Sequence, residues 1–415
     1  FELDKEEFKQ KIAKSENLDE LYKSFLTLKM RADFNFFEPS KYDEIIAASD
    51  NNYTIAPMRS DPSDYFYGAW LGRCIGCAVG QPVELWDYKA IREWYKNAKK
   101  YPVNGFVPTH SGENVNNGAA TDEKINSMPE DDDIRFTVLA LKLLKSKGFD
   151  FDTYDVGANW VYTLPFRAIC TAENQAYLNF CNVDEFGPWG KPENAMEIFE
   201  KNNVNTYLNP YREWIGAQIR IDGYAYAAAG NPRLAAKLAH TDAYLSHTKN
   251  GIYGAMFFAA MISAAFAEKN VDYCFRIALT QIPKNSRFYK EMLLAESIAL
   301  SCKTDDEFIE RINNETNKYS FVHAINNSAI CVGAILYADG DFKKAVTLSV
   351  AAGMDTDCNG ATVGSFMGAL VGGKNIPSEL KDPLNDTFYC GLSPYHPGKI
   401  SEFAKEYEQL YKKLC

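Results

Sequence analysis

The sequence predicts an all-α protein, a compact multi-helix globule with two glycine-striped central helices. Apolar residues recur at helical spacing along most of the chain, and no apolar alternation with a period of two extends over any length. Hydrophobic residues make up 46% of the 415 residues, enough for a large core. We therefore expect packed helices without a sheet. The expected helices span residues 64–80, 87–99, 133–147, 172–180, 212–228, 232–240, 251–268, 290–302, 323–337, 341–351 and 358–371.

The two glycine rows are the most unusual feature of the helical pattern. Gly68, Gly72, Gly76 and Gly80 repeat every four residues, and so do Gly360, Gly364, Gly368 and Gly372. Glycine costs about 1 kcal/mol per helical position relative to alanine, so the rows need a reason. An i, i+4 row lies along one face, and removal of its Cβ atoms lets another backbone approach closely. The rows therefore predict two tightly packed central helices.

The sequence divides into an extension, residues 1–60, and a main domain, residues 61–415. Apolar side chains at helical spacing, such as Phe8, Ile12 and Leu18, predict that one face of the extension packs on the core. Within the main domain, residues 111–127 and 184–210 are polar and are expected to be long surface loops. Such loops serve as lids or binding loops, or else as mobile linkers, and both interpretations stay open.

The charge of the chain excludes several classes of function. The 44 Lys and Arg against 55 Asp and Glu give a net charge of −11. Without a long basic run, we expect no nucleic-acid groove and no binding to an anionic membrane. The longest apolar run, residues 252–267, is shorter than the ~20 residues that a membrane span requires.

Ten cysteines are spread over the chain, several of them within apolar helical patterns. In a chain of this length we interpret them as reduced core residues rather than as a disulfide framework. Cys74 and Cys77 have the spacing of a redox motif, but no βαβ pattern surrounds them. No secretory signal is visible in the sequence, which begins at Phe1, and we expect a cytoplasmic location.

The strongest local signal is an acidic run, Glu130–Asp133, directly before an apolar helical pattern. One interpretation is N-capping, since carboxylates accept the free N–H groups of a helix start and complement its dipole. A single aspartate would suffice for that. Because four adjacent carboxylates repel each other, binding of a cation is the second interpretation, and the residues alone favour neither.

A second acidic cluster, Asp355 and Asp357, precedes the second glycine-striped helix. With Asn359 and Gly360 it imitates the opening of an EF-hand loop, but the position of the bidentate glutamate holds Phe366, so that interpretation fails. Two helix starts then supply five acidic side chains: Asp131, Asp132, Asp133, Asp355 and Asp357. Such oxygen ligands suit Mg²⁺, Mn²⁺ or Ca²⁺, and two divalent ions would nearly neutralise the set.

Other residues give weaker signals. His247 lies in a polar segment just before an apolar helix, where a lone histidine is more often structural but can also line a pocket. The sequence holds no Walker loop, no dinucleotide-binding fingerprint and no serine nucleophile elbow.

Three motifs together resemble the ADP-ribosylglycohydrolases, which include the dinitrogenase-reductase-activating glycohydrolases. Residues 76–84 read Gly-Cys-Ala-Val-Gly-Gln-Pro-Val-Glu, similar to the family's Gly-Asp-Ala-Leu-Gly-x-Pro-x-Glu. Residues 131–137 read Asp-Asp-Asp-Ile-Arg-Phe-Thr, similar to Thr-Asp-Asp-Thr-x-Met-Thr. Residues 353–358 read Gly-Met-Asp-Thr-Asp-Cys, similar to Gly-Gly-Asp-Thr-Asp-Thr. The motifs lie in the family's order within residues 64–373, and residues 246–250 occupy the place of its Thr-His motif.

The resemblance implies an all-α fold with a dinuclear metal site at helix N-termini, with Mg²⁺ as the first candidate and Mn²⁺ or Ca²⁺ as alternatives. It places metal ligands at Asp132, Asp133, Asp355 and Asp357, while Asp131 takes the place of a ligating threonine. Cys358 replaces another ligating threonine, and Cys77 replaces a common aspartate. Because a thiol is a poor Mg²⁺ ligand, the coordination position at residue 358 is open.

The resemblance also implies roles in catalysis and substrate binding. Glu84 falls on the family's acidic residue near the reacting carbon and would transfer a proton between water and the leaving group, with metal ions holding the ribose hydroxyls. Residues expected to bind substrate are His247, Asn250, Gly80 and Gly353.

The expected function is hydrolysis of a ribosyl glycosidic bond, releasing ADP-ribose from a modified protein, nucleic acid or small molecule. One alternative is a hydrolase of another nucleoside or ribosyl conjugate, which the changes at Cys77, Asp131 and Cys358 allow. Another is a non-catalytic protein of the same fold used for binding. Retention of five mutually repelling carboxylates argues against the last, and the oligomeric state stays open.

Overall fold

The computed structural model describes residues 4–25, 27–50, 52–109, 115–187 and 190–415. The chain forms two units, one up to Phe37 and one from Glu38 to Cys415. The second unit contains all of the motifs singled out above.

The first unit holds two short helices, α1 (Lys5–Lys14) and α2 (Leu18–Phe25). Asp4 caps α1 by accepting hydrogen bonds from the backbone of Glu6 and Glu7, while Glu7 returns a contact to the Asp4 backbone. None of the described residues of α1 and α2 is buried. Packing of this extension on the core stays a prediction. Residues 38–60, which we placed in the extension, lie in the second unit, where Ile45 is fully buried.

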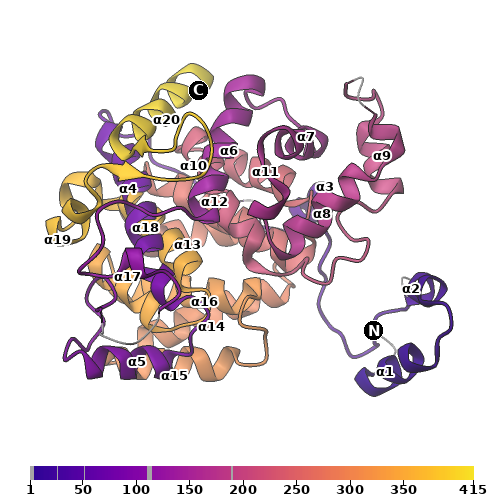
Figure 1. Ribbon diagram of the computed structural model, residues 1–415, viewed down its shortest axis with the longest axis horizontal. Helices are drawn as coiled ribbons and strands as arrows, with labels where there is room; N and C mark the ends of the chain where they lie inside the picture. Colours follow the sequence, from indigo (N-terminus) through magenta and orange to yellow (C-terminus); the bar gives the residue numbers. More distant parts are fainter. Residues whose placement is uncertain (1–3, 26, 51, 110–114, 188–189) are drawn as a thin grey trace. The chain divides into compact units, whose positions relative to one another are not determined.

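The second unit is built almost entirely of helices (Figure 1). Its α-helices are α3 (Tyr42–Ala47), α4 (Ser63–Gly80), α5 (Tyr88–Asn97), α6 (Asp132–Lys147), α7 (Thr153–Thr163), α8 (Thr171–Cys181), α9 (Ala195–Lys201), α10 (Asp222–Ala227), α11 (Pro232–Ala243), α12 (Lys249–Ala265), α13 (Val271–Leu279), α14 (Arg287–Ser301), α15 (Asp305–Thr316), α16 (Ala324–Ala338), α17 (Phe342–Ala351), α18 (Thr356–Val371), α19 (Ser378–Lys381) and α20 (Ile400–Leu414). Short 3₁₀ helices include η1 (Gln81–Val83) and η5 (Ile215–Arg220). The all-α prediction is confirmed.

The glycine rows of α4 and α18 face each other, so the prediction of two tightly packed central helices is confirmed. The two helices lie side by side and antiparallel, with Gly68 opposite Gly368, Gly72 opposite Gly364 and Gly76 opposite Gly360. A Cβ added to Gly76 would lie 1.8 Å from the carbonyl oxygen of Gly360. Only glycine permits this approach of two backbones, so the rows fix the centre of the domain.

Other helices enclose this central pair. Residues 250–265 of α12 are all buried, and this helix packs against α11 and α18. The C-terminal helix α20 covers α4 and α10. Within the described part of the chain, no helix has the length and apolar character needed to span a membrane. The expected cytoplasmic location stays a prediction.

Several elements differ from the sequence-based expectation. A two-residue antiparallel ladder joins β1 (Thr387–Phe388) to β2 (Gly398–Lys399), and strands this short leave no period-two pattern. Helix α9 lies within the predicted loop 184–210, and α7, α13, α15 and α20 were not predicted. Of the loop predicted over 111–127, residues 111–114 lie outside the described residues. All ten cysteines are described and none forms a disulfide, as expected, but Cys170, Cys181 and Cys415 are exposed, so their assignment to the core was wrong.

Candidate metal centre

The antiparallel pairing of α4 and α18 places the end of one helix beside the start of the other. Residues 81–84 follow α4 directly, and residues 355–357 begin α18. The backbones interlock here, because Leu85 N–H donates to the Met354 carbonyl at 2.8 Å and Met354 N–H donates to the Trp86 carbonyl at 3.0 Å. A Cβ at Gly353, whose φ is +77°, would lie 2.6 Å from the Trp86 carbonyl oxygen. These contacts hold Glu84 next to the acidic start of α18.

The N-terminus of α6 lies next to the end of α4, where its N-cap residue Asp131 contacts Gln81. Asp131 is the N-cap residue, and its Oδ1 accepts a hydrogen bond from the Asp133 N–H at 2.9 Å. Its Oδ2 accepts one from the Gln81 side-chain amide at 2.5 Å. The capping interpretation is therefore right for Asp131, and it orients the carboxylate without excluding a cation.

Asp133 is completely buried, and both of its carboxylate oxygens have partners. Its Oδ1 lies 3.0 Å from the guanidinium Nη2 of Arg73. Its Oδ2 accepts a hydrogen bond from the Cys358 thiol at 3.2 Å. Arg73 is itself fully buried and also contacts Asp222 at 2.9 Å. Two buried carboxylates thus share one guanidinium, whose single positive charge can offset only one of theirs.

Asp357, in the first turn of α18, has a carboxylate oxygen without a protein partner. The side chain is 3% exposed, and its Oδ1 is buried and accepts no hydrogen bond from any described residue. A buried carboxylate oxygen without a donor is costly unless a cation approaches it. Burial and the neighbouring charge of Asp355 raise the pKa of Asp357 well above its ordinary value.

Burial and neighbouring negative charge also raise the pKa values of other acids in the cluster. Burial, with the charges of Asp355 and Asp132, raises the pKa of Glu84 to about 7. Burial and the charge of Asp131 raise the pKa of Asp132 to about 7. Burial also raises the pKa of Asp133, although Arg73 opposes that shift. Positive charge at the site would relieve these shifts, and the partial positive charge of two helix N-termini already contributes.

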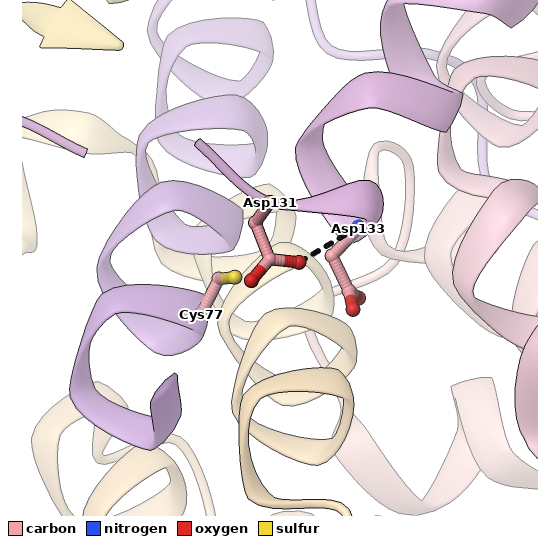
Figure 2. Close-up of side chains that lie close together, drawn as sticks. All are labelled: Cys77, Asp131 and Asp133. Carbon is pink, nitrogen blue, oxygen red and sulfur yellow. Dashed lines mark hydrogen bonds between the residues drawn. The ribbon is translucent and has the colours of Figure 1, made fainter. Parts of the chain in front are cut away.

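Among the described residues, three groups of His, Cys, Asp or Glu side chains bring their ligand atoms within 4.8 Å of one another. They are Glu84 with Asp355 and Asp357, Asp133 with Asp357 and Cys358, and Cys77 with Asp131 and Asp133. In Figure 2 the Cys77 sulfur points toward the Asp131 carboxylate, which lies between it and Asp133. Carboxylate oxygens that are buried and clustered fit a divalent cation.

The sequence match decides the family. The family model for ADP-ribosylglycohydrolase matches residues 58–414, most of the chain. The chain belongs to the ADP-ribosylglycohydrolase family. Membership supports a glycosidase-type hydrolase that acts on ADP-ribosyl conjugates, and the family is metal-dependent.

Two individual proteins are also similar. An uncharacterized protein of Archaeoglobus fulgidus is 23% identical over 326 residues, which cover 77% of this chain and 92% of that protein. A solved structure described as an ADP-ribosylglycohydrolase-related protein complex has 17% identity and a TM-score of 0.50. It covers 86% of this chain and 100% of its own, and it supports the fold alone.

Most of the metal ligands expected from the ADP-ribosylglycohydrolase motifs lie together. Asp131, Asp133, Asp355 and Asp357 all enter one of the three groups, as does the expected catalytic Glu84. Asp132 is half-buried and belongs to none of the groups found among the described residues. Its role as a ligand stays a prediction.

The expected substrate-binding residues have structural partners. His247 and Asn250 are fully buried, with a His247 Nδ1 to Ser246 Oγ distance of 2.8 Å. The Asn250 amide donates to Glu213 at 2.7 Å, and its Oδ1 accepts from Phe288 N–H. The Thr356 hydroxyl donates to the Gly80 carbonyl at 2.8 Å. Contact of these residues, or of Gly353, with substrate stays a prediction.

Two residues that support the site were missed in the sequence. Arg73 is the only charged residue between Gly68 and Gly80 in an apolar, glycine-striped helix, a position that signals a buried partner of opposite charge. Gln81 directly follows the same helix, is 4% exposed and donates to Asp131. Its partner comes from a distant part of the chain, so no local pattern could reveal the contact.

Proposed function

We propose that the protein is a metal-dependent hydrolase that cleaves a ribosyl glycosidic bond, with ADP-ribose released from an ADP-ribosylated acceptor as the leading case. The observation that carries the proposal is the gathering of Glu84, Asp355 and Asp357 at one helix start. One oxygen of Asp357 is buried there without a hydrogen-bond partner among the described residues. Family membership supplies the substrate class.

Five aspartates would hold the metal: Asp131, Asp132, Asp133, Asp355 and Asp357. The set suits two divalent cations, with Mg²⁺ as the first candidate and Mn²⁺ or Ca²⁺ as alternatives. When bound, such ions supply charge that orients sugar hydroxyls and acidifies water.

Glu84 is the residue we assign to proton transfer. It is half-buried at the edge of the cluster, so its carboxylate can meet both the acids and a substrate that enters from solvent. A carboxyl group in this position can accept a proton at Oε and release it within one turnover. Water and the departing acceptor oxygen or nitrogen are the groups between which the proton would pass.

The residues around Glu84 position the metal ligands and do not transfer protons themselves. Gln81 and the start of α6 orient Asp131, and Arg73 fixes Asp133. Since a misplaced ligand weakens catalysis, this support belongs to the proposed activity.

Binding of free ADP-ribose tests the substrate class. Calorimetry with Mg²⁺ or Mn²⁺ should show binding that disappears after chelation, because the ribose hydroxyls would be held through the cations. Absence of binding in both conditions would move the proposal to another riboside or to a non-catalytic role.

Turnover of an ADP-ribosylated protein or small molecule tests Glu84 separately. Glu84→Gln should retain metal binding and lose on the order of 100-fold or more in kcat. The matched control is Glu315→Gln, an exposed carboxylate on α15, which should keep full turnover. Full turnover by Glu84→Gln with both metals bound would remove Glu84 from the mechanism.

A further inference from the structure

The carboxylate cluster has two halves with different chemistry. One half, Glu84 with Asp355 and Asp357, offers oxygen atoms only. The other half adds sulfur, since Cys358 joins Asp133 and Asp357 within 4.8 Å. Asp357 belongs to both halves and is the side chain that an ion in each half would share.

The thiol of Cys358 is aimed into the cluster. The residue lies in the first turn of α18, is 6% exposed, and donates its S–H to Asp133 Oδ2 at 3.2 Å. The other oxygen of Asp133 is held by Arg73, which fixes the carboxylate toward the sulfur. An ion placed between Sγ and Oδ2 would take the position of the thiol proton.

An oxygen of Asp357 that has no hydrogen-bond partner among the described residues is an independent sign of a ligand at the cluster, where Asp357 belongs to both halves. Asp357 is 97% buried, and its Oδ1 accepts no hydrogen bond among the described residues. Asp133, Asp357 and Cys358 thus bring a fixed carboxylate, an unsatisfied carboxylate and a thiol to one place.

A second thiol, Cys77, lies near Asp131 and Asp133 but in a group that is already satisfied. Both oxygens of Asp131 accept hydrogen bonds, one from the Asp133 N–H and one from Gln81. Asp131 also lies between the Cys77 sulfur and the Asp133 carboxylate (Figure 2). The two cysteines are therefore not equivalent.

We propose that the centre is heterometallic. A hard ion such as Mg²⁺ would be held by Asp355 and Asp357 in the all-oxygen half, where Glu84 keeps its role in proton transfer. A borderline ion such as Zn²⁺, Fe²⁺ or Co²⁺ would be held by Cys358, Asp133 and Asp357. The inference rests on the proposed function only for the presence of a dinuclear centre. When the borderline ion binds, the thiol proton leaves to solvent and the thiolate becomes the ligand. Sulfur ligands select such ions over Mg²⁺, which prefers oxygen.

Cobalt binding to the full-length, metal-free protein tests the proposal without any assay of turnover. A thiolate bound to Co²⁺ adds a near-ultraviolet sulfur-to-metal charge-transfer absorption, which an all-oxygen site lacks. We expect two Co²⁺ per chain with this absorption, and a large excess of Mg²⁺ should displace one ion while the absorption stays.

The two cysteines supply a matched pair of variants. Cys358→Ser should abolish the charge-transfer absorption, whereas Cys77→Ser, also a buried thiol beside Asp133, should retain it. If Cys358→Ser does not fold, X-ray absorption of the Zn²⁺-loaded wild type replaces it, with one sulfur expected at about 2.3 Å from zinc.

Three results would overturn the proposal: cobalt bound without the absorption, no cobalt bound, or an absorption that survives Cys358→Ser. A centre that binds cobalt through oxygen alone and still hydrolyses an ADP-ribosylated substrate would remove the thiolate while leaving the proposed function intact. A thiolate-bound ion in a protein that does not hydrolyse the substrate would support the thiolate ligand and contradict the proposed function.

Discussion

The helix starts of α6 and α18 both carry aspartates, but they differ in how far the protein satisfies the carboxylate oxygens with hydrogen bonds. At α6, both oxygens of Asp131 accept hydrogen bonds, and both oxygens of Asp133 have partners in Arg73 and Cys358. At α18, an oxygen of Asp357 is buried without a described partner. The first set is held rigidly by the protein, and the second leaves a position for a cation.

This difference explains how five acids share one site. Carboxylates that were all free would repel each other and loosen the helix starts, whereas carboxylates that were all satisfied would have little affinity for metal. Charge supplied by a buried arginine on one side lets unsatisfied charge persist on the other. The comparison predicts that Arg73, which pairs with Asp133 of α6, matters mainly for stability, and that Asp357 of α18 matters mainly for metal binding.

Arg73→Gln should produce the largest effect. It leaves Asp133 and Asp222 buried without their common cation, and loss of one partner of a buried ion pair costs about 3–5 kcal/mol of unfolding free energy. Denaturant unfolding of the metal-free protein measures this loss, and excess divalent metal should restore part of it by neutralising Asp133.

The control for this variant is Arg276→Gln, which removes a half-exposed arginine paired with Asp272 and Glu296. Exposed ion pairs contribute about 1 kcal/mol or less. Equal losses for the two variants would contradict the assignment of Arg73 as the charge partner of α6.

Asp357→Asn should act in the opposite sense on the other helix. The metal-free protein should be as stable as the wild type or more so, because a buried, unpaired charge is removed. Metal affinity, measured by calorimetry, should fall at least about 100-fold, the upper range for outer-shell positions, since a shared ligand is lost. Glu93→Gln, an exposed carboxylate on α5, is the control and should change neither quantity. Unchanged metal affinity in Asp357→Asn would end the distinction between the two helix starts.

The pH dependence of the chelated protein tests the repulsion directly. The pKa of Glu84 is raised to about 7, whereas the unfolded chain has an ordinary glutamate near 4.3. Between these values the folded state binds more protons than the unfolded state, so this residue favours folding at low pH and the benefit is lost as pH rises through 7.

Comparison with Glu84→Gln isolates that contribution from the rest of the chain. The stability of the variant relative to the wild type should increase by about 2 kcal/mol from pH 5 to pH 8, a value reduced for the partial exposure of Glu84. Urea unfolding in chelator at the two pH values measures it. A difference that does not vary with pH would show that Glu84 ionises normally.

The helical pattern and the carboxylates could be predicted from the sequence, because both depend on local spacing. The i, i+4 glycines predicted the central pair, and the two acidic helix starts marked carboxylates that lie close together in the structure, while their binding of metal stays a prediction. The different hydrogen bonding of the two helix starts could not be predicted from the sequence. Gln81 and Arg73 contact partners that lie 50 and 60 residues away along the chain. The two-residue strands were missed because two residues cannot display a period.

Gln81 offers the smallest and most selective test of the comparison. Gln81→Leu keeps the size of the side chain but removes the amide that holds Asp131 Oδ2, while the Asp133 N–H still holds Oδ1. We expect about a 10-fold loss of metal affinity, the lower range for an outer-shell contact, and little change in metal-free stability. Gln81→Glu places a like charge beside Asp131 and should lower affinity further at neutral pH, but recover it partly at acidic pH, where the added carboxyl is protonated. Equal metal affinities for the wild type and both variants would show that the hydrogen bond from the Asp133 N–H alone orients Asp131. Gln81 would then contribute only packing.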